Sequence, residues 1–177
     1  MKKDIDMPTL TKLKGGDVAL YGNQVNVGDK APIVTLPNSG LEEVTIGGAC
    51  DKAQLIVAVP SLDTPVCAME TTKFNNQAAE VEGATVFVVS MDLPFAAKRF
   101  CSTEGIENLQ VLSDYREKCF STQYGTLIAE GALRGLSARV IFVIGKEGTV
   151  TYKEIVPEIT EEPNYDAALE ALKAVAK

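Results

Sequence analysis

The sequence predicts an α/β domain with a mixed central sheet flanked by helices. Two segments of strand length, the continuous apolar run Leu55–Val59 and the largely apolar TVFVVS segment Thr85–Ser90, are typical of strands that are covered on both faces, and a helix-forming segment separates them. The chain ends with a hairpin, which is expected to add antiparallel strands to the sheet, and an amphipathic helix. The chain has 177 residues, 46% of them hydrophobic, and shows no repeat or linker, so residues 1–177 are expected to form a single domain.

The first third of the chain is predicted to contain short strands. Between about Val18 and Val27, turn signals at Gly15–Gly16 and Gly22–Asn23 predict an N-terminal β-hairpin. Two further extended segments, Ile33–Leu36 and Val44–Ile46, are separated by a Pro-Asn-Ser-Gly turn.

A helix is expected after each of the two apolar runs. Pro60 ends the first run. The segment Pro65–Glu82, which is rich in good helix formers, is predicted to be a helix that stops at Gly83. After the second run, Asp92 is expected to cap a helix that begins at Pro94 and ends near Ser102.

The last part of the chain alternates between the two kinds of element. Val111–Ser113 is predicted to be a short strand and Glu117–Tyr124 a short helix. Val140–Ile144 and Val150–Ile155 flank a Gly-Lys-Glu-Gly turn and predict a hairpin, and Asn164–Ala176 has apolar residues at helical spacing. The order of all these elements resembles that of a thioredoxin-like fold.

The overall composition argues against several classes of protein. A net charge of -7 and a pI of about 4.7 leave no basic surface for nucleic acid or anionic lipid. No apolar run approaches the roughly 20 residues that cross a membrane, so no membrane insertion is expected. The first 14 residues contain no signal-peptide core, which predicts a cytoplasmic protein.

Cysteine and histidine usage narrows the chemistry. Four dispersed cysteines are too few for a disulfide-stapled secreted scaffold, and any disulfide is expected to be transient and catalytic. The absence of histidine excludes Ser/His and Cys/His pairs. The cysteines lack the close paired spacing of zinc sites, so neither a metal nor another cofactor is expected.

Cys67 follows a loop that is suited to starting a helix. Thr64 is a good N-cap and Pro65 a good first helical residue, which places Cys67 at the third helical position. Unpaired backbone N–H groups and the helix dipole favour an anion there, and the thiolate is the reactive form of cysteine. The alternative is a small buried hydrophobic residue, as many free cysteines are.

At this point the sequence resembles a known family. The string PSLDTPVC resembles the Pro-x-x-x-Thr-x-x-Cys motif of the peroxiredoxins, and its DTPVC form is similar to the thiol peroxidase subfamily. The strings KGGDVALYG, DLPFAAKRFC, GLSARVIFVI and EITEEPNYDAALEAL resemble that subfamily too. The resemblance implies that Cys67 is the peroxidatic cysteine, that Thr64 hydrogen-bonds the peroxide and that Pro60 shields the site.

The same resemblance assigns two more residues. Arg139 would hold the thiolate and polarise the peroxide; the alternative, a surface salt bridge, fits poorly because Arg139 begins an apolar strand, where an unpaired charge is costly. Cys101 would be the resolving cysteine. A disulfide needs Cα atoms about 4.4 to 6.8 Å apart, so we expect the helix carrying Cys101, or the first turn at Cys67, to unwind locally. Cys50 and Cys119 are interpreted as structural or incidental.

The implied function is a thiol-dependent peroxidase. It would reduce hydrogen peroxide and alkyl hydroperoxides through a Cys67 sulfenic acid and an intrachain disulfide to Cys101, with thioredoxin as reductant and a homodimer as the assembly. A peroxide-sensing disulfide relay and a non-catalytic binding module are the alternatives. A disulfide carrier does not need Thr64 and Arg139, and the sequence has no Cys-x-x-Cys motif, so the enzyme is favoured.

Overall fold

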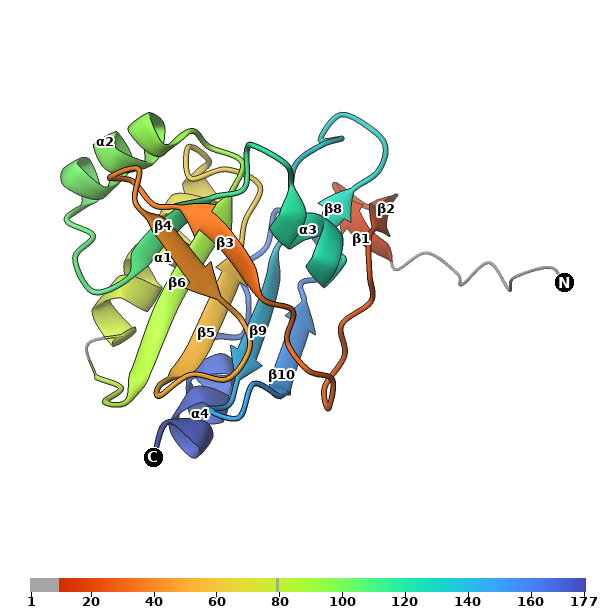
Figure 1. Cartoon of the computed structure of the whole chain (residues 1–177). Coiled ribbons are helices and arrows are strands. Elements are labelled where there is room, and N and C mark those ends of the chain that lie inside the picture. The colour runs from red at the N-terminus through yellow and green to blue at the C-terminus, as the bar shows by residue number, and fades with distance from the viewer. Residues whose placement is uncertain (1–9, 79) are drawn as a thin grey trace, which may run out of the picture.

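The computed structural model describes residues 10–78 and 80–177 of the chain. Its centre is a five-stranded sheet with the strand order β10-β9-β5-β6-β7 (Figure 1). β6 and β7 run parallel to β5, whereas β9 and β10 add antiparallel pairing. The predicted mixed sheet is confirmed, with the bounds β5 Ala53–Ala58, β6 Ala84–Ser90, β7 Gln110–Ser113, β9 Val140–Ile144 and β10 Val150–Ile155.

The two faces of this sheet are covered by different elements. The central strand β5 is buried throughout, and its successive side chains alternate between two apolar clusters. Leu55 and Val57 pack toward one side with side chains of three helices, which are α1 Pro65–Ala78, α2 Pro94–Glu104 and α4 Tyr165–Ala176. Ile56 and Ala58 pack toward the other side with three smaller elements, which are β3 Val34–Pro37, β4 Glu43–Ile46 and α3 Cys119–Tyr124.

Figure 1 shows the same two layers, with the β3–β4 hairpin and α3 in front of the sheet and α1 and α4 behind it. None of the helices in the described part of the chain is long and apolar enough to span a membrane. The N-terminal residues 1–9, on which part of the prediction against a secretion signal depended, lie outside the described residues.

The N-terminal hairpin exists, but the predicted position was wrong. Its strands are β1 Leu10–Leu13 and β2 Gly16–Tyr21, and residues 22–27 form no strand. The turn is at Lys14 and Gly15, which both have positive φ, as a two-residue hairpin turn of type I′ requires. Gly22 marks a close approach instead, because a Cβ there would lie 2.3 Å from the carbonyl oxygen of Thr122. The small strand β8, Leu127–Ile128, which pairs with β2, was not predicted.

Three helix predictions also need correction. α1 ends at Ala78 and residues 80–82 are not helical, while Ala79 lies outside the described residues. Gly83 is a packing glycine, since a Cβ there would lie 2.3 Å from the backbone oxygen of Ala176. α3 begins at Cys119 rather than Glu117, because Lys118 has a left-handed φ of 52°.

Asp92 does not cap α2, which is the third correction. The helix begins at Pro94 as predicted, but its N-cap is Leu93, and no side chain caps it. The Asp92 carboxylate is bonded elsewhere, to groups outside α2.

Sheet topology brings three distant segments to one edge. The end of β5 pairs antiparallel with the start of β9, as Ala58 opposite Val140 shows. β5 and β6 are parallel, so the segments that follow them leave the sheet at the same edge. The loop before Cys67, the segment before β9 and the segment before α2 therefore meet there.

Candidate active site

Cys67 is fully buried in the first turn of α1. The Thr64 hydroxyl accepts a hydrogen bond from the backbone N–H of Cys67 at 3.3 Å and donates one to the carbonyl of Ser61 at 3.2 Å. The backbone carbonyl of Thr64 accepts from Ala68 N–H at 2.9 Å, which is the first helical bond. The predicted capping by Thr64 is confirmed, and it fixes where the sulfur of Cys67 lies.

Arg139 lies against this sulfur. Its Nη2 atom is 3.3 Å from the Sγ of Cys67, and its side chain is only 2% exposed. Nε and Nη2 also donate to the carbonyl oxygen of Ile159, at 3.0 and 2.9 Å. The alternative of a surface salt bridge is therefore wrong. A planar guanidinium that is held in this way places a permanent positive charge beside the thiol.

Glu70 is a third member of the cluster, and the sequence interpretation missed it. Nη1 of Arg139 donates to its Oε2, and the Glu70 side chain is fully buried. Burial raises the pKa of the Glu70 carboxyl to about 7, while the charge of Arg139 and its hydrogen bond oppose the rise. The one signal in the sequence was spacing, since Glu70 follows Cys67 by three residues and shares its helix face.

Pro60 and Cys101, the remaining predicted site residues, make no hydrogen bond to Cys67. Pro60 is buried in the bend that follows β5. Cys101 is half-buried near the end of α2 and packs with Phe100 against the apolar cluster that contains Cys67. Burial raises the pKa of the Cys101 thiol. All four cysteines of the described chain are free thiols.

Cys50 and Cys119 lie outside this cluster. Cys50 is exposed, and its thiol donates to its neighbour Asp51 at 3.2 Å. Cys119 packs against the apolar cluster on the other face of the sheet, where burial is the main cause of its raised pKa. Among the described residues, neither thiol has an arginine partner, and the interpretation that both are structural or incidental stays a prediction.

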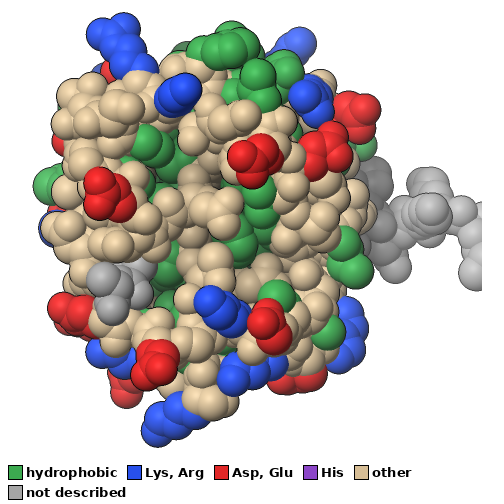
Figure 2. Space-filling view, turned by 60° about the vertical axis from the view of Figure 1, so that its left-hand side comes forward, with side chains coloured by type: hydrophobic (Ala, Val, Ile, Leu, Met, Phe, Trp, Pro, Cys, Tyr) green, Lys and Arg blue, Asp and Glu red, His purple; other side chains and the backbone are tan. Residues whose placement is uncertain are grey.

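A cleft of about 320 Å³ opens between the loop before Cys67 and α2. Leu62, Asp63 and Asp92 line one side of it, and Arg99 and Phe100 line the other. Figure 2 shows apolar side chains gathered at the top of the molecule, the end at which α2 lies in Figure 1, with charged side chains scattered over the rest of that face. The cleft borders the loop that leads into α1, and the buried Cys67 itself does not line it.

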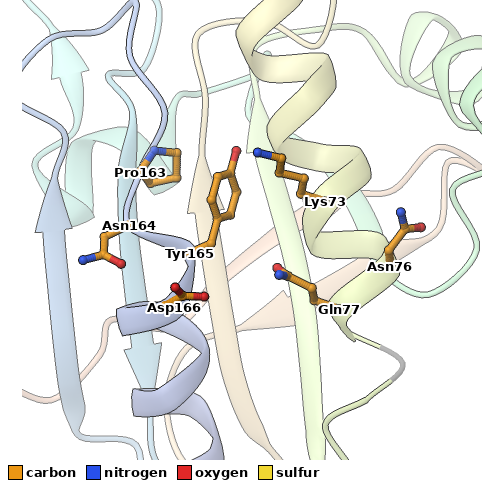
Figure 3. Close-up of a pocket in the computed structure, with 7 residues that line it drawn as sticks. All are labelled: Lys73, Asn76, Gln77, Pro163, Asn164, Tyr165 and Asp166. Atoms are coloured by element: carbon orange, nitrogen blue, oxygen red, sulfur yellow. The ribbon is translucent and has the colours of Figure 1, made fainter.

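A second pocket, of about 550 Å³, lies between α1 and the start of α4 (Figure 3). Lys73 from α1 lies over the Tyr165 ring, 4.7 Å from its centre, and pairs with Glu162 at 2.9 Å. Cys67 and Arg139 do not line this pocket. Among the described residues, no group of His, Cys, Asp or Glu side chains could hold a metal ion.

Comparison with known proteins gives one consistent answer. The Redoxin family model matches residues 26–169. A thiol peroxidase of Aquifex aeolicus is 52% identical over 94% of this chain and 98% of its own length. A thiol peroxidase of Campylobacter jejuni is 58% identical over 88% of each chain.

Solved structures agree with the sequence relatives. The crystal structure of a peroxiredoxin-like protein from Aquifex aeolicus superposes with a TM-score of 0.91, at 52% identity over 94% of this chain and 96% of that one. A thiol peroxidase from Chromobacterium violaceum, at 20% identity, has a TM-score of 0.83 over 93% of this chain and 95% of that one, a likeness of fold. The thioredoxin-like fold is confirmed. The chain therefore belongs to the redoxin family, as a peroxiredoxin-type peroxidase of the thiol peroxidase subfamily.

Proposed function

We propose that this peroxidase reduces hydrogen peroxide and alkyl hydroperoxides with the thiolate of Cys67 and is regenerated by thioredoxin. The observation that carries the proposal is the 3.3 Å contact between Nη2 of Arg139 and the Sγ of Cys67 inside a buried helix start. A guanidinium stabilises a thiolate without having to exchange a proton with it, so the site functions without histidine.

In the first step, the Cys67 thiolate attacks the terminal oxygen of ROOH. The S–O bond forms as the O–O bond breaks, and the departing alkoxide takes up one proton from water, which leaves a sulfenic acid and ROH. Arg139 stabilises the negative charge that moves from sulfur to the leaving oxygen. The Thr64 hydroxyl orients the peroxide, and Pro60 shields the site.

In the second step, the Cys101 thiol attacks the sulfenic acid, forming the Cys67–Cys101 disulfide and releasing water. The raised pKa of Cys101 keeps it protonated, so it does not compete with Cys67 for peroxide. A thioredoxin dithiol then reduces the disulfide by exchange and becomes oxidised itself.

We also propose that alkyl hydroperoxides suit the site, because apolar residues surround Cys67. Leu62 borders the cleft beside α2, and Val66 and Met69 flank Cys67 on α1. A homodimer formed beside the active-site loop and a cytoplasmic location stay predictions.

The test is turnover with thioredoxin, thioredoxin reductase and NADPH, with hydrogen peroxide and cumene hydroperoxide as substrates. Cys67→Ser is expected to abolish turnover. Cys101→Ser is expected to react with peroxide once, at Cys67, but not to be recycled by thioredoxin, because the disulfide to Cys101 cannot form. Cys50→Ser and Cys119→Ser are matched controls that should behave like the wild type. Stoichiometric oxidation without turnover would favour the disulfide relay, and turnover by Cys67→Ser would overturn the proposal.

A further inference from the structure

The Asp92 carboxylate joins two segments that are far apart in the sequence. Its Oδ1 accepts from the Ser61 hydroxyl at 2.7 Å, and its Oδ2 accepts from the backbone N–H of Leu62 at 2.7 Å. Both donors belong to the loop that leads into α1 and Cys67 (residues 61–64, the Cys67 loop). Charge-assisted bonds of this length are among the stronger hydrogen bonds in proteins.

Asp92 is itself fixed to the central sheet. The hydroxyl of Ser90, the last residue of β6, donates to Oδ2 at 2.7 Å and accepts from the backbone N–H of Asp92 at 3.2 Å. Ser113, the last residue of β7, donates through its hydroxyl to the backbone carbonyl of Asp92. Asp92 is thus an anchor that is bonded to the ends of β6 and β7, and the Cys67 loop is bonded to it.

Asp92 also borders both segments that carry the cysteines of the proposed disulfide. Asp92 is two residues before Pro94, the start of the helix that carries Cys101, and it lines the cleft between that helix and the Cys67 loop. The loop on its other side ends at Thr64, whose hydroxyl bonds the Cys67 N–H. A displacement of the Cys67 loop toward Cys101 strains or breaks the Asp92 bonds to Ser61 and Leu62.

We propose that Asp92 is a positioning residue. It holds the Cys67 loop to the sheet while peroxide is reduced beside Arg139, and it retards the movement that lets Cys67 reach Cys101. This inference rests on the proposed function, because it needs both the sulfenic acid and the disulfide.

The Cys67 sulfenic acid can react in two ways, and the competition between them measures how firmly Asp92 holds the Cys67 loop. When the loop is released, Cys67–SOH and the Cys101 thiol give the disulfide and water. When the loop stays anchored, a second ROOH reacts with Cys67–SOH, and the products are a sulfinic acid and ROH. The peroxide concentration that converts half of the enzyme to sulfinic acid therefore reports how firmly the loop is held.

Asp92→Asn is the main variant, because an amide can accept through only one of its two ends. Ser61→Ala is the second, since it removes the side-chain bond from the loop to Asp92, together with the local bond from Asp63 N–H to the Ser61 hydroxyl, and leaves the bonds of Asp92 to the sheet intact. Asp114→Asn is the matched control. Asp114 is a buried carboxylate that accepts from the N–H groups of Phe120 and Ser121, at 3.0 and 2.9 Å, on α3.

The experiment is intact-mass analysis of each full-length protein, cycling with thioredoxin, thioredoxin reductase and NADPH at rising cumene hydroperoxide, beside kcat/KM for the peroxide. Asp92→Asn is expected to raise the half-conversion concentration about fivefold or more and to lower kcat/KM, with a smaller effect for Ser61→Ala. Asp114→Asn is expected to leave the half-conversion concentration unchanged.

A half-conversion concentration that is unchanged in both Asp92→Asn and Ser61→Ala would overturn the inference, as would an equal shift in Asp114→Asn. If Asp92→Asn does not fold, Ser61→Ala decides. A wild-type protein that forms no Cys67–Cys101 disulfide would refute the proposed function itself.

Discussion

Nη2 of Arg139 lies 3.3 Å from the Sγ of Cys67, although 72 residues separate them in the chain. The antiparallel pairing of β5 with β9 places the two residues at one edge of the sheet. The same guanidinium also donates to the carboxylate of Glu70 and to the carbonyl of Ile159. One side chain thus orders three acceptors, which a lysine ammonium cannot do in the same planar geometry.

The first prediction concerns the planar set of N–H donors on the Arg139 guanidinium. Arg139→Lys is expected to keep a positive charge but to lower kcat/KM for peroxide by about 100-fold, since loss of one aligned donor to a developing charge costs that much. Steady-state kinetics with cumene hydroperoxide measure it. Arg134→Lys, at an exposed arginine, is the control and should be silent. An Arg139→Lys enzyme with wild-type kcat/KM would contradict a role for the guanidinium geometry.

The second prediction concerns stability and pH through Glu70. Its pKa is about 7 in the folded protein and 4.5 as an ordinary value. Between these values the folded state binds more protons than the unfolded state, so this contribution to stability falls as pH rises from 4.5 to 7. The free energy of unfolding of the wild type, relative to Glu70→Gln, should decrease by up to about 3 kcal/mol across this window.

Urea denaturation of both proteins below pH 4.5 and above pH 7 measures this difference. Other titrating groups affect both proteins alike and cancel in the comparison. Parallel pH profiles for the two proteins would show that the folded protein does not retain the Glu70 proton.

The third prediction concerns the Thr64 hydroxyl. Thr64→Val keeps the shape of the side chain but removes the acceptor for Cys67 N–H and the donor to Ser61. We expect a loss of about 1 kcal/mol in the free energy of unfolding. We also expect a fall of about tenfold in kcat/KM for peroxide. Thr64→Ser keeps the hydroxyl and should stay close to the wild type in denaturation and in kinetics. Equal losses in both variants would point to packing rather than hydrogen bonding.

The fourth prediction concerns movement on oxidation. Cys67 is fully buried at the start of α1 and Cys101 half-buried near the end of α2, so forming their disulfide is expected to unwind one of these turns. Hydrogen–deuterium exchange should show faster uptake in peptides from α1 or α2 of the oxidised protein, with β9 unchanged as the internal control. Identical uptake in the reduced and oxidised proteins at both helices would refute local unwinding.

Much of the fold could be predicted from the sequence, because many of its helices and strands depend on local residue patterns. The apolar runs of β5 and β6, the turn between β9 and β10 and the helical spacing in α4 each predict an element from neighbouring residues. Two of the errors arose at glycines that contact a distant backbone. The local pattern predicts a turn at Gly22 and a helix end at Gly83, whereas a Cβ at either position would lie 2.3 Å from the backbone oxygen of Thr122 or Ala176.

The sequence alone determined that Cys67 lies in the first turn of a helix capped by a threonine, since Thr64, Pro65 and Cys67 are close together in the chain. The partners of its sulfur were decided by the tertiary structure, because β5–β9 pairing sets where Arg139 lies and the burial of α1 turns Glu70 inward. The Asp92 bonds to Ser61 and Leu62 depend in the same way on the parallel pairing of β5 and β6. Spacing along a chain carries no information on which strand ends will adjoin, and only the assembled sheet supplies it.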